Sequence, residues 1–114
     1  MSVSLLERKC KPCEGGVKPL GRPAAEELLG ALHADWQYDE AASRISRNFE
    51  FPSFAGTIAF ANAVAWIATV EGHHPEMTIN YSTLMVVYRT TSIDGLSDND
   101  FICAAKVDRL AADI

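Results

Sequence analysis

The sequence lacks the features that are typical of nucleic-acid-binding, membrane and exported proteins. It contains no run of lysine or arginine: 10 basic residues stand against 15 acidic ones, which leaves a formal net charge of −5. Proteins that bind duplex nucleic acid normally present a basic face, so we expect no direct binding of DNA or RNA. No apolar run resembles the roughly 18 residues that cross a bilayer, and the first nine residues, which include Glu7, do not resemble a signal peptide. The sequence therefore predicts neither a membrane partner nor export.

Cysteine is scarce as well, with 3 residues in the chain. Without an export signal, so few cysteines predict a cytoplasmic protein whose thiols stay reduced. The remaining composition is ordinary, because 48% hydrophobic and 22% charged residues are typical of a folded domain and exclude a disordered chain. A length of 114 residues fits a single domain with one modest core.

Residues 1–21 differ from the rest of the chain, because they are rich in glycine and proline and lack apolar periodicity. We predict an extended N-terminal arm here, followed by one domain over residues 22–114. The arm contains Cys10 and Cys13 at the spacing of half a zinc site, but no second pair of ligands accompanies them. Free thiols in the arm are the favoured interpretation, and a zinc ion shared between subunits is the alternative.

Hydrophobic periodicity beyond the arm predicts the element order helix, two strands, helix, two strands, helix. The expected helices cover residues 23–33, 54–70 and 98–110, and the expected strands cover 36–38, 43–51, 77–81 and 84–91. Two strand pairs separated by a helix predict an α+β fold, in which a four-stranded antiparallel sheet carries helices on one face. Because the edge strands of an open sheet are commonly covered by a second copy, we expect a homo-oligomer.

Three side-chain patterns add detail to this prediction. Strand 43–51 has one apolar face, which Arg47 interrupts. Helix 54–70 is apolar over most of its girth. Its central stripe consists of Phe54, Ile58, Ala61, Ala65 and Ala68, and it is widened by Phe60, Ala63, Val64 and Ile67. The last helix begins after Ser97, and Asp100 completes a capping-box-like pattern with that serine.

The run with the clearest chemical potential is EGHHPE, residues 71–76. Its histidines, His73 and His74, directly follow the predicted long helix. Pro75 restricts His74 to an extended conformation, and neighbouring side chains of an extended segment point to opposite sides. A metal ion shared by the two imidazoles is therefore disfavoured. Acid–base catalysis and a pair of surface loop histidines are both consistent with the pattern, since an imidazole titrates near neutral pH.

These residues also carry a resemblance to a known family, the pterin-4a-carbinolamine dehydratases. The resemblance rests on the run 71–76, Tyr81, residues 90–97 (TTSIDGLS), Asp100, residues 49–54 (FEFPSF) and residues 59–64 (AFANAV). It extends over about residues 23–110 and includes the order of the elements. The arm with Cys10 and Cys13 resembles that of bacterial members associated with phenylalanine hydroxylation.

The resemblance implies an activity and a set of site residues. Members of this family remove water from a 4a-hydroxytetrahydropterin to give quinonoid dihydropterin during tetrahydropterin recycling, without a metal ion or an organic cofactor. By resemblance, His73 is the general acid at the leaving hydroxyl, His74 and Pro75 shape and bind the pterin, and Asp100 orients the site. The implied catalytic residues are His73, His74 and Asp100. Further substrate contacts are implied for Thr90, Thr91, Ser92 and Ile93. The implied assembly is a homodimer or homotetramer.

The sequence departs from the family pattern at two positions. Thr91 stands where the family usually has a third histidine, and Thr69 stands where an acidic residue is common. A threonine hydroxyl donates a hydrogen bond but does not exchange a proton near neutral pH. Glu71 does not replace the missing acid, because two residues of helix rotate it by about 200°. We therefore expect dehydration that is weakened or confined to one 4a epimer. The alternative is a pterin-binding or protein-interaction module with little catalysis, in a molybdopterin-related or regulatory dimerisation role.

Overall fold

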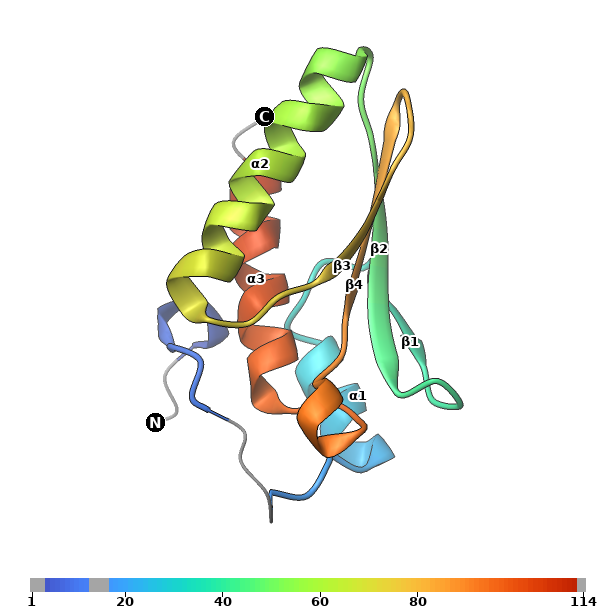
Figure 1. Ribbon diagram of the computed structural model, residues 1–114. Helices are drawn as coiled ribbons and strands as arrows, with labels where there is room; N and C mark the ends of the chain where they lie inside the picture. Colours follow the sequence, from blue (N-terminus) through green and yellow to red (C-terminus); the bar gives the residue numbers. More distant parts are fainter. Residues whose placement is uncertain (1–3, 13–16, 113–114) are drawn as a thin grey trace.

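Four antiparallel strands form one sheet, covered on one face by helices, in the computed structural model, which describes residues 4–12 and 17–112 (Figure 1). The helices are α1 (Arg22–Leu29), α2 (Phe54–Glu71) and α3 (Asp98–Ala112), with short 3-10 turns η1 (Leu5–Glu7) and η2 (Thr91–Ile93). The strands are β1 (Gln37–Asp39), β2 (Arg44–Glu50), β3 (Glu76–Ile79) and β4 (Thr83–Tyr88). The predicted α+β class and element order are both confirmed.

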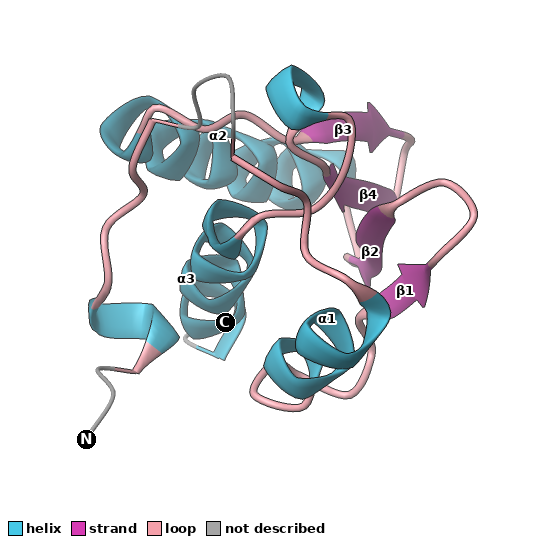
Figure 2. Ribbon diagram, turned by 90° about the horizontal axis from the view of Figure 1, so that it is seen from below, coloured by secondary structure: helices cyan, strands magenta, loops and turns pink. Residues whose placement is uncertain are grey.

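The strand order is β1-β2-β4-β3, which places the two longest strands in the centre of the sheet. Ile45 on β2 pairs with Tyr88 on β4, and Phe49 pairs with Leu84. All four side chains are buried beneath the helices, as the predicted alternation requires. Figure 2 shows α2 and α3 together on one side of this sheet. The intervening residues of β2 and β4 therefore face away from these two helices.

Helix α2 has a well-formed cap at each end. The Ser53 hydroxyl accepts a hydrogen bond from the Gly56 N–H at 3.1 Å, which satisfies one of the free amide groups of the first turn. At the other end Gly72 adopts a left-handed conformation with φ of 67°, which glycine tolerates without a steric penalty. The helix therefore ends at Glu71, one residue beyond the predicted end.

The buried face of α2 is shifted from the predicted stripe. It consists of Thr57, Phe60, Ala61, Val64 and Ala68. Phe54, expected in the stripe, is 47% exposed and stacks on Tyr81 instead. Because the helix is apolar on all sides, periodicity alone did not distinguish the face that packs on the sheet from the face that does not.

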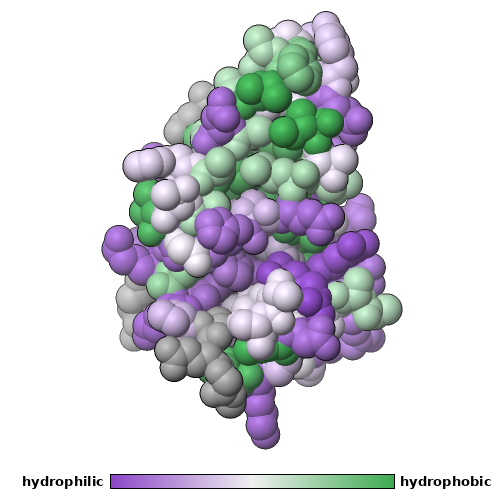
Figure 3. All heavy atoms as spheres, in the orientation of Figure 1, coloured by the Kyte–Doolittle hydropathy of each residue, from purple (hydrophilic) through white to green (hydrophobic). Residues whose placement is uncertain are grey.

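The prediction that no segment has the length and apolarity of a membrane span is wrong for α2. Its 18 residues have a mean hydropathy of 1.3, and only 28% of that stretch is buried. The buried part is core of the α+β fold, whereas Trp66 and Val70 are 67% and 55% exposed. Apolar side chains gather over α2 in the upper part of Figure 3, and polar side chains dominate below. The outer face of α2 is thus an apolar surface that the isolated chain leaves uncovered.

The largest differences from the predicted ends are those of α1 and β4. α1 stops at Leu29 rather than His33, because the following residues form tighter turns with backbone bonds from Ala31 and Leu32. β4 stops at Tyr88, and its continuation forms an isolated bridge between Thr90 and Gly95 before η2. In both places local hydrogen bonds replace the regular ladder.

Arg47 interrupts the apolar face of β2 because it binds a carboxylate on α3. Its Nη1 lies 2.6 Å from Oδ1 of Asp108, and its guanidinium lies 4.4 Å from the centre of the Phe49 ring. Asp108 also accepts a hydrogen bond from the indole N–H of Trp36 at 2.7 Å. Trp36 itself precedes β1 rather than belonging to it, contrary to the prediction. A half-buried carboxylate thus joins α3 to the sheet and to the segment after α1.

The described part of the N-terminal arm packs on the domain. Leu5 is buried in the core, Arg8 forms an ion pair of 2.8 Å with Asp98, and the Leu20 N–H donates to the Leu96 carbonyl at 2.8 Å. Cys13 lies outside the described residues, so the zinc alternative for the cysteine pair stays a prediction. Within residues 4–12 and 17–112, no group of three His, Cys, Asp or Glu side chains is placed to hold a metal ion.

We predict that Asp108→Ala destabilises the fold by about 3 kcal/mol, because it leaves the little-exposed Arg47 guanidinium and the Trp36 indole without their acceptor. The free energy of unfolding in urea measures this. Glu26→Ala, which removes an exposed pair with Arg22, is the matched control and should change stability little. Equal losses in the two variants would contradict the structural role of Asp108.

Candidate active site

A histidine–carboxylate pair lies where α2, β4 and α3 meet. The left-handed turn at Gly72 directs His73 inward, where its Nε2 lies 2.6 Å from Oδ1 of Asp100. The His73 side chain is 11% exposed and the Asp100 side chain is fully buried. A buried carboxylate needs several donors, and the surrounding backbone and side chains provide them.

The second oxygen of Asp100 completes the predicted capping box. Its Oδ2 accepts hydrogen bonds from the Ser97 N–H at 3.0 Å and from the Thr90 hydroxyl at 2.8 Å. The Ser97 hydroxyl in turn accepts from the Asn99 N–H at 3.2 Å and lies 2.7 Å from the Thr90 oxygen. Because Thr90 uses its only proton on Asp100, Ser97 donates to Thr90. These bonds hold the carboxylate at one orientation toward His73.

This arrangement determines which nitrogen of His73 can exchange a proton. An ionised carboxylate only accepts hydrogen bonds, so the Nε2 that faces Asp100 carries a proton. Nδ1 is then an acceptor in the neutral ring and a donor in the charged ring. The imidazole also lies nearly parallel to the Tyr88 ring, at 10° with centroids 6.0 Å apart. His73 is thus held on two sides, and Nδ1 is the ring nitrogen that does not face Asp100.

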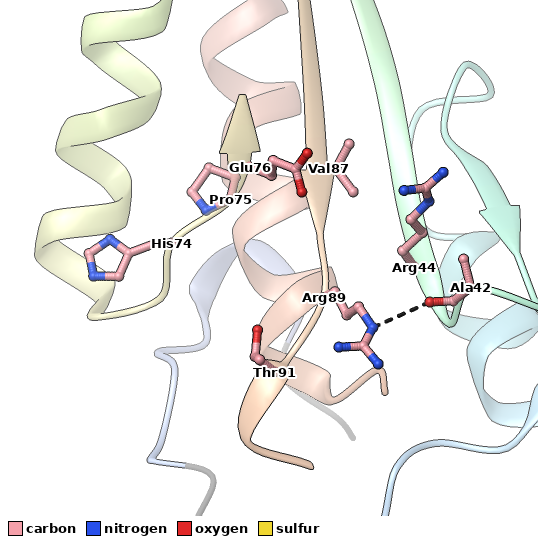
Figure 4. Close-up of a pocket in the computed structure, with 8 residues that line it drawn as sticks. All are labelled: Ala42, Arg44, His74, Pro75, Glu76, Val87, Arg89 and Thr91. Atoms are coloured by element: carbon pink, nitrogen blue, oxygen red, sulfur yellow. Dashed lines mark hydrogen bonds between the residues drawn. The ribbon is translucent and has the colours of Figure 1, made fainter. Parts of the chain in front are cut away.

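An open cavity of about 470 Å³ is lined by the chain neighbour of His73, His74, and by that of Thr90, Thr91 (Figure 4). The residues that line it are Ala42, Arg44, His74, Pro75, Glu76, Val87, Arg89 and Thr91. Val87 belongs to the residues of β4 that face away from α2 and α3, so the cavity lies toward that side of the sheet. Its size is in the range of pockets for small organic ligands. Figure 4 shows His74 at one end of the lining and Arg44 at the other.

Two arginines of this cavity, Arg44 and Arg89, were not among the predicted site residues. Arg89 donates from Nε to the Ala42 carbonyl at 3.3 Å and forms an ion pair with Asp94. Arg44 is on the neighbouring strand, one position before the Ile45–Tyr88 pair. The sequence signal for them was the alternation of β2 and β4, which puts both arginines on the outward face of the sheet. The strand register, which the sequence does not show, brings them together.

The predicted site residues fall into two adjoining groups. His73, Thr90 and Asp100 form the buried cluster, whereas His74, Pro75 and Thr91 line the cavity. Ser92 and Ile93 lie in η2 and are not among the described lining residues. The opposite directions expected for the two histidines agree with this division, since one imidazole is buried against Asp100 and the other is exposed.

The position expected for an acid is not filled by Glu71. Thr69 is exposed, and its hydroxyl donates back to the Ala65 carbonyl at 3.0 Å. The Glu71 carboxylate is turned toward the arm, where Oε1 accepts from the Cys10 N–H at 2.9 Å and Oε2 lies 3.7 Å from Nζ of Lys106. Glu71 therefore supports the arm, as its helical register indicates.

Two relatives with similar sequences share one name. In Nitrosomonas eutropha and Legionella pneumophila, proteins named "Putative pterin-4-alpha-carbinolamine dehydratase" are 56% and 41% identical to it. The first alignment covers 93% of this chain and 92% of the relative, and the second covers 99% and 100%.

Two solved structures share the fold. The transcriptional coactivator/pterin dehydratase of Brucella melitensis superimposes with a TM-score of 0.77 at 30% identity, covering 82% of this chain and 99% of that one. A pterin dehydratase-like protein identified as a RuBisCO assembly factor in the α-carboxysome gives 0.59 at 25% identity, covering 69% and 92%. The model of the family described as pterin 4 alpha carbinolamine dehydratase matches residues 18–110, so the chain belongs to that family.

Proposed function

We propose that the chain dehydrates 4a-hydroxytetrahydropterin to quinonoid dihydropterin in tetrahydropterin recycling. The observation that carries this proposal is the 2.6 Å contact between His73 and the buried Asp100, together with a cavity lined by the next residues along the chain, His74, Pro75 and Thr91. Family membership supports the substrate class. The two described cysteines are free thiols, which suits the reducing cytoplasm in which we place the reaction.

The reaction breaks the bond between C4a and the hydroxyl oxygen. The hydroxyl leaves as water once an acid has protonated it, while the electrons of the ring nitrogen form the new double bond and a base removes the ring proton. His73 suits the acid step, because Asp100 stabilises its charged ring and Nδ1 then carries the transferable proton. His74, exposed in the cavity, binds the pterin, and Pro75 fixes its orientation.

Thr91 makes this proton machinery one-sided. It lines the cavity and offers a hydroxyl where an imidazole would exchange protons. Loss of one acid–base group typically costs about 10²–10⁴ in rate. We therefore propose a slower dehydratase that favours one 4a epimer, because Thr91 offers a hydroxyl where the family pattern implies a further imidazole.

A second candidate function is pterin or protein binding with little catalysis. It is favoured by Thr91 in the cavity and by the uncovered apolar face of α2. The names of the two solved structures, a transcriptional coactivator/pterin dehydratase and a RuBisCO assembly factor, show that proteins of this fold have other roles. A measurement of the dehydration rate distinguishes the catalytic function from the binding function.

We also propose that the chain forms a homodimer or homotetramer through its outer apolar surface. Trp66 and Val70 expose most of their area on α2, and Ile79 is 43% exposed on the edge strand β3. An apolar helix face and an open strand edge are both commonly covered by a second copy.

We predict that the wild type accelerates quinonoid dihydropterin formation from fresh 4a-hydroxytetrahydropterin, followed by rapid absorbance measurements. His73→Ala should lower the rate by about 10²-fold or more, since the acid is lost. His33→Ala removes an exposed histidine far from the site and is the matched control. If the wild type does not exceed buffer while pterin still binds in a titration, the binding function replaces the catalytic one.

Thr91→His should raise the rate by roughly 10²-fold, and mainly for the slower of the two 4a epimers, because it restores an ionisable group to the cavity. Separate assays of each epimer measure this. Equal and fully rapid dehydration of both epimers by the wild type would contradict the one-sided mechanism.

Light scattering should return at least twice the 12.4 kDa of one chain at micromolar concentration. Trp66→Glu should shift the mass toward the monomer, because it places a charge on the apolar surface, while the exposed Asn48→Glu on β2 should not. A wild-type monomer would overturn the proposed assembly.

A further inference from the structure

Two thiols from distant parts of the chain face each other at the base of the arm. Sγ of Cys10 lies 3.5 Å from Sγ of Cys103 on α3, across 93 positions of sequence. Cys103 is fully buried, whereas Cys10 is partly exposed. The dehydratase site uses neither side chain. The pair thus combines one thiol that a dissolved oxidant can reach with one that it cannot.

The contact is held by bonds that do not involve sulfur. The Cys10 N–H donates to Oε1 of Glu71 at 2.9 Å. Lys11 and Asn99 form two further bonds, from the Lys11 N–H to Oδ1 at 3.0 Å and from Nδ2 to the Lys11 carbonyl at 2.6 Å. Figure 1 shows the arm crossing beside the ends of α2 and α3 here. These anchors fix the Cys10 backbone, so the facing of the two sulfurs follows from the fold.

We propose that Cys10 and Cys103 form a redox-sensitive pair, which a peroxide converts to an intramolecular disulfide that ties the arm to α3. The S–S distance falls from 3.5 Å to about 2.05 Å, a movement that side-chain torsions and a small shift of the arm can supply.

The chemistry proceeds in two balanced steps. The Cys10 thiolate attacks one peroxide oxygen, the O–O bond breaks, and sulfenic acid and water form. Cys103 then attacks the sulfenic sulfur, the S–O bond breaks, and the hydroxyl leaves with the Cys103 proton as a second water. Two thiols are oxidised by two electrons and one peroxide is reduced to two waters. A dithiol reductant reverses the change by exchange.

The order of these steps follows from the surroundings of the two thiols. The pKa of Cys103 is raised by its hydrogen bond with Cys10 and by its burial. Cys103 therefore stays protonated and unreactive toward a dissolved oxidant. Cys10 is the thiol within reach of solvent. Cys103 therefore acts as the resolving thiol, once a sulfenic acid has formed beside it.

The disulfide would close a loop of the chain from residue 10 to residue 103, and all the candidate site residues belong to that loop. Cys103 follows Asp100 by one turn of α3, and the Cys10 backbone binds Glu71, two residues before His73. Tyr88, which stacks on His73, is close enough that the two thiols add to the effect of burial in raising its pKa. A crosslink here restricts the unfolded chain and holds the arm against α2 and α3.

The test uses the full chain with Cys13→Ser, so that any peptide containing residue 10 can be crosslinked only through Cys10. After treatment with hydrogen peroxide, mass spectrometry should show the loss of two hydrogens and a proteolytic peptide that joins Cys10 to Cys103. The thermal midpoint of the oxidised protein should rise by roughly 5–10 °C and return after dithiothreitol.

Cys10→Ser and Cys103→Ala should each abolish both changes, and Cys10→Ser, at a partly exposed position, tests the pair without altering the core. A crosslink between subunits, overoxidised Cys10 without a crosslink, or an unchanged thermal midpoint would overturn the proposal. In the wild type, a Cys10–Cys13 disulfide or a zinc ion bound by the thiols, seen by mass spectrometry under native conditions, would also overturn it. None of these readouts depends on dehydratase activity.

Discussion

The buried carboxylate of Asp100 is the interaction on which the site depends. One oxygen binds His73 after α2, and the other binds the Thr90 hydroxyl after β4 and the Ser97 amide before α3. An unpaired charge at a fully buried position would be costly, so the three segments must meet for the carboxylate to be satisfied. The carboxylate that caps the last helix is therefore also the carboxylate that orients the imidazole.

The cavity and the uncovered apolar surface are built from different elements. Arg44 and Arg89, outward side chains at the ends of β2 and β4, line the cavity. The apolar area lies on the outer side of α2 and includes Trp66. The proposed chemistry and the proposed assembly therefore rest on separate sets of side chains.

Thr91 is the position at which the proposed mechanism departs from what the family resemblance implies. The scaffold, the inward imidazole of His73 and its carboxylate partner are present. The wall of the cavity carries the His74 imidazole, the Thr91 hydroxyl and the Arg89 guanidinium. In the proposed function these few side chains, rather than the shared fold, determine the activity.

Features that depend on neighbours along the chain were predictable from the sequence: the order of helices and strands, the apolar face of β2, the Ser97–Asp100 cap and the divergence of the two histidines. Tertiary structure decided the rest, because contacts between distant side chains leave no periodic trace. In the sequence, Arg47 only interrupts the apolar face of its strand. In the fold it forms an ion pair with Asp108 on α3. The buried face of the uniformly apolar α2, the two arginines of the cavity and the facing thiols were likewise set by packing and register.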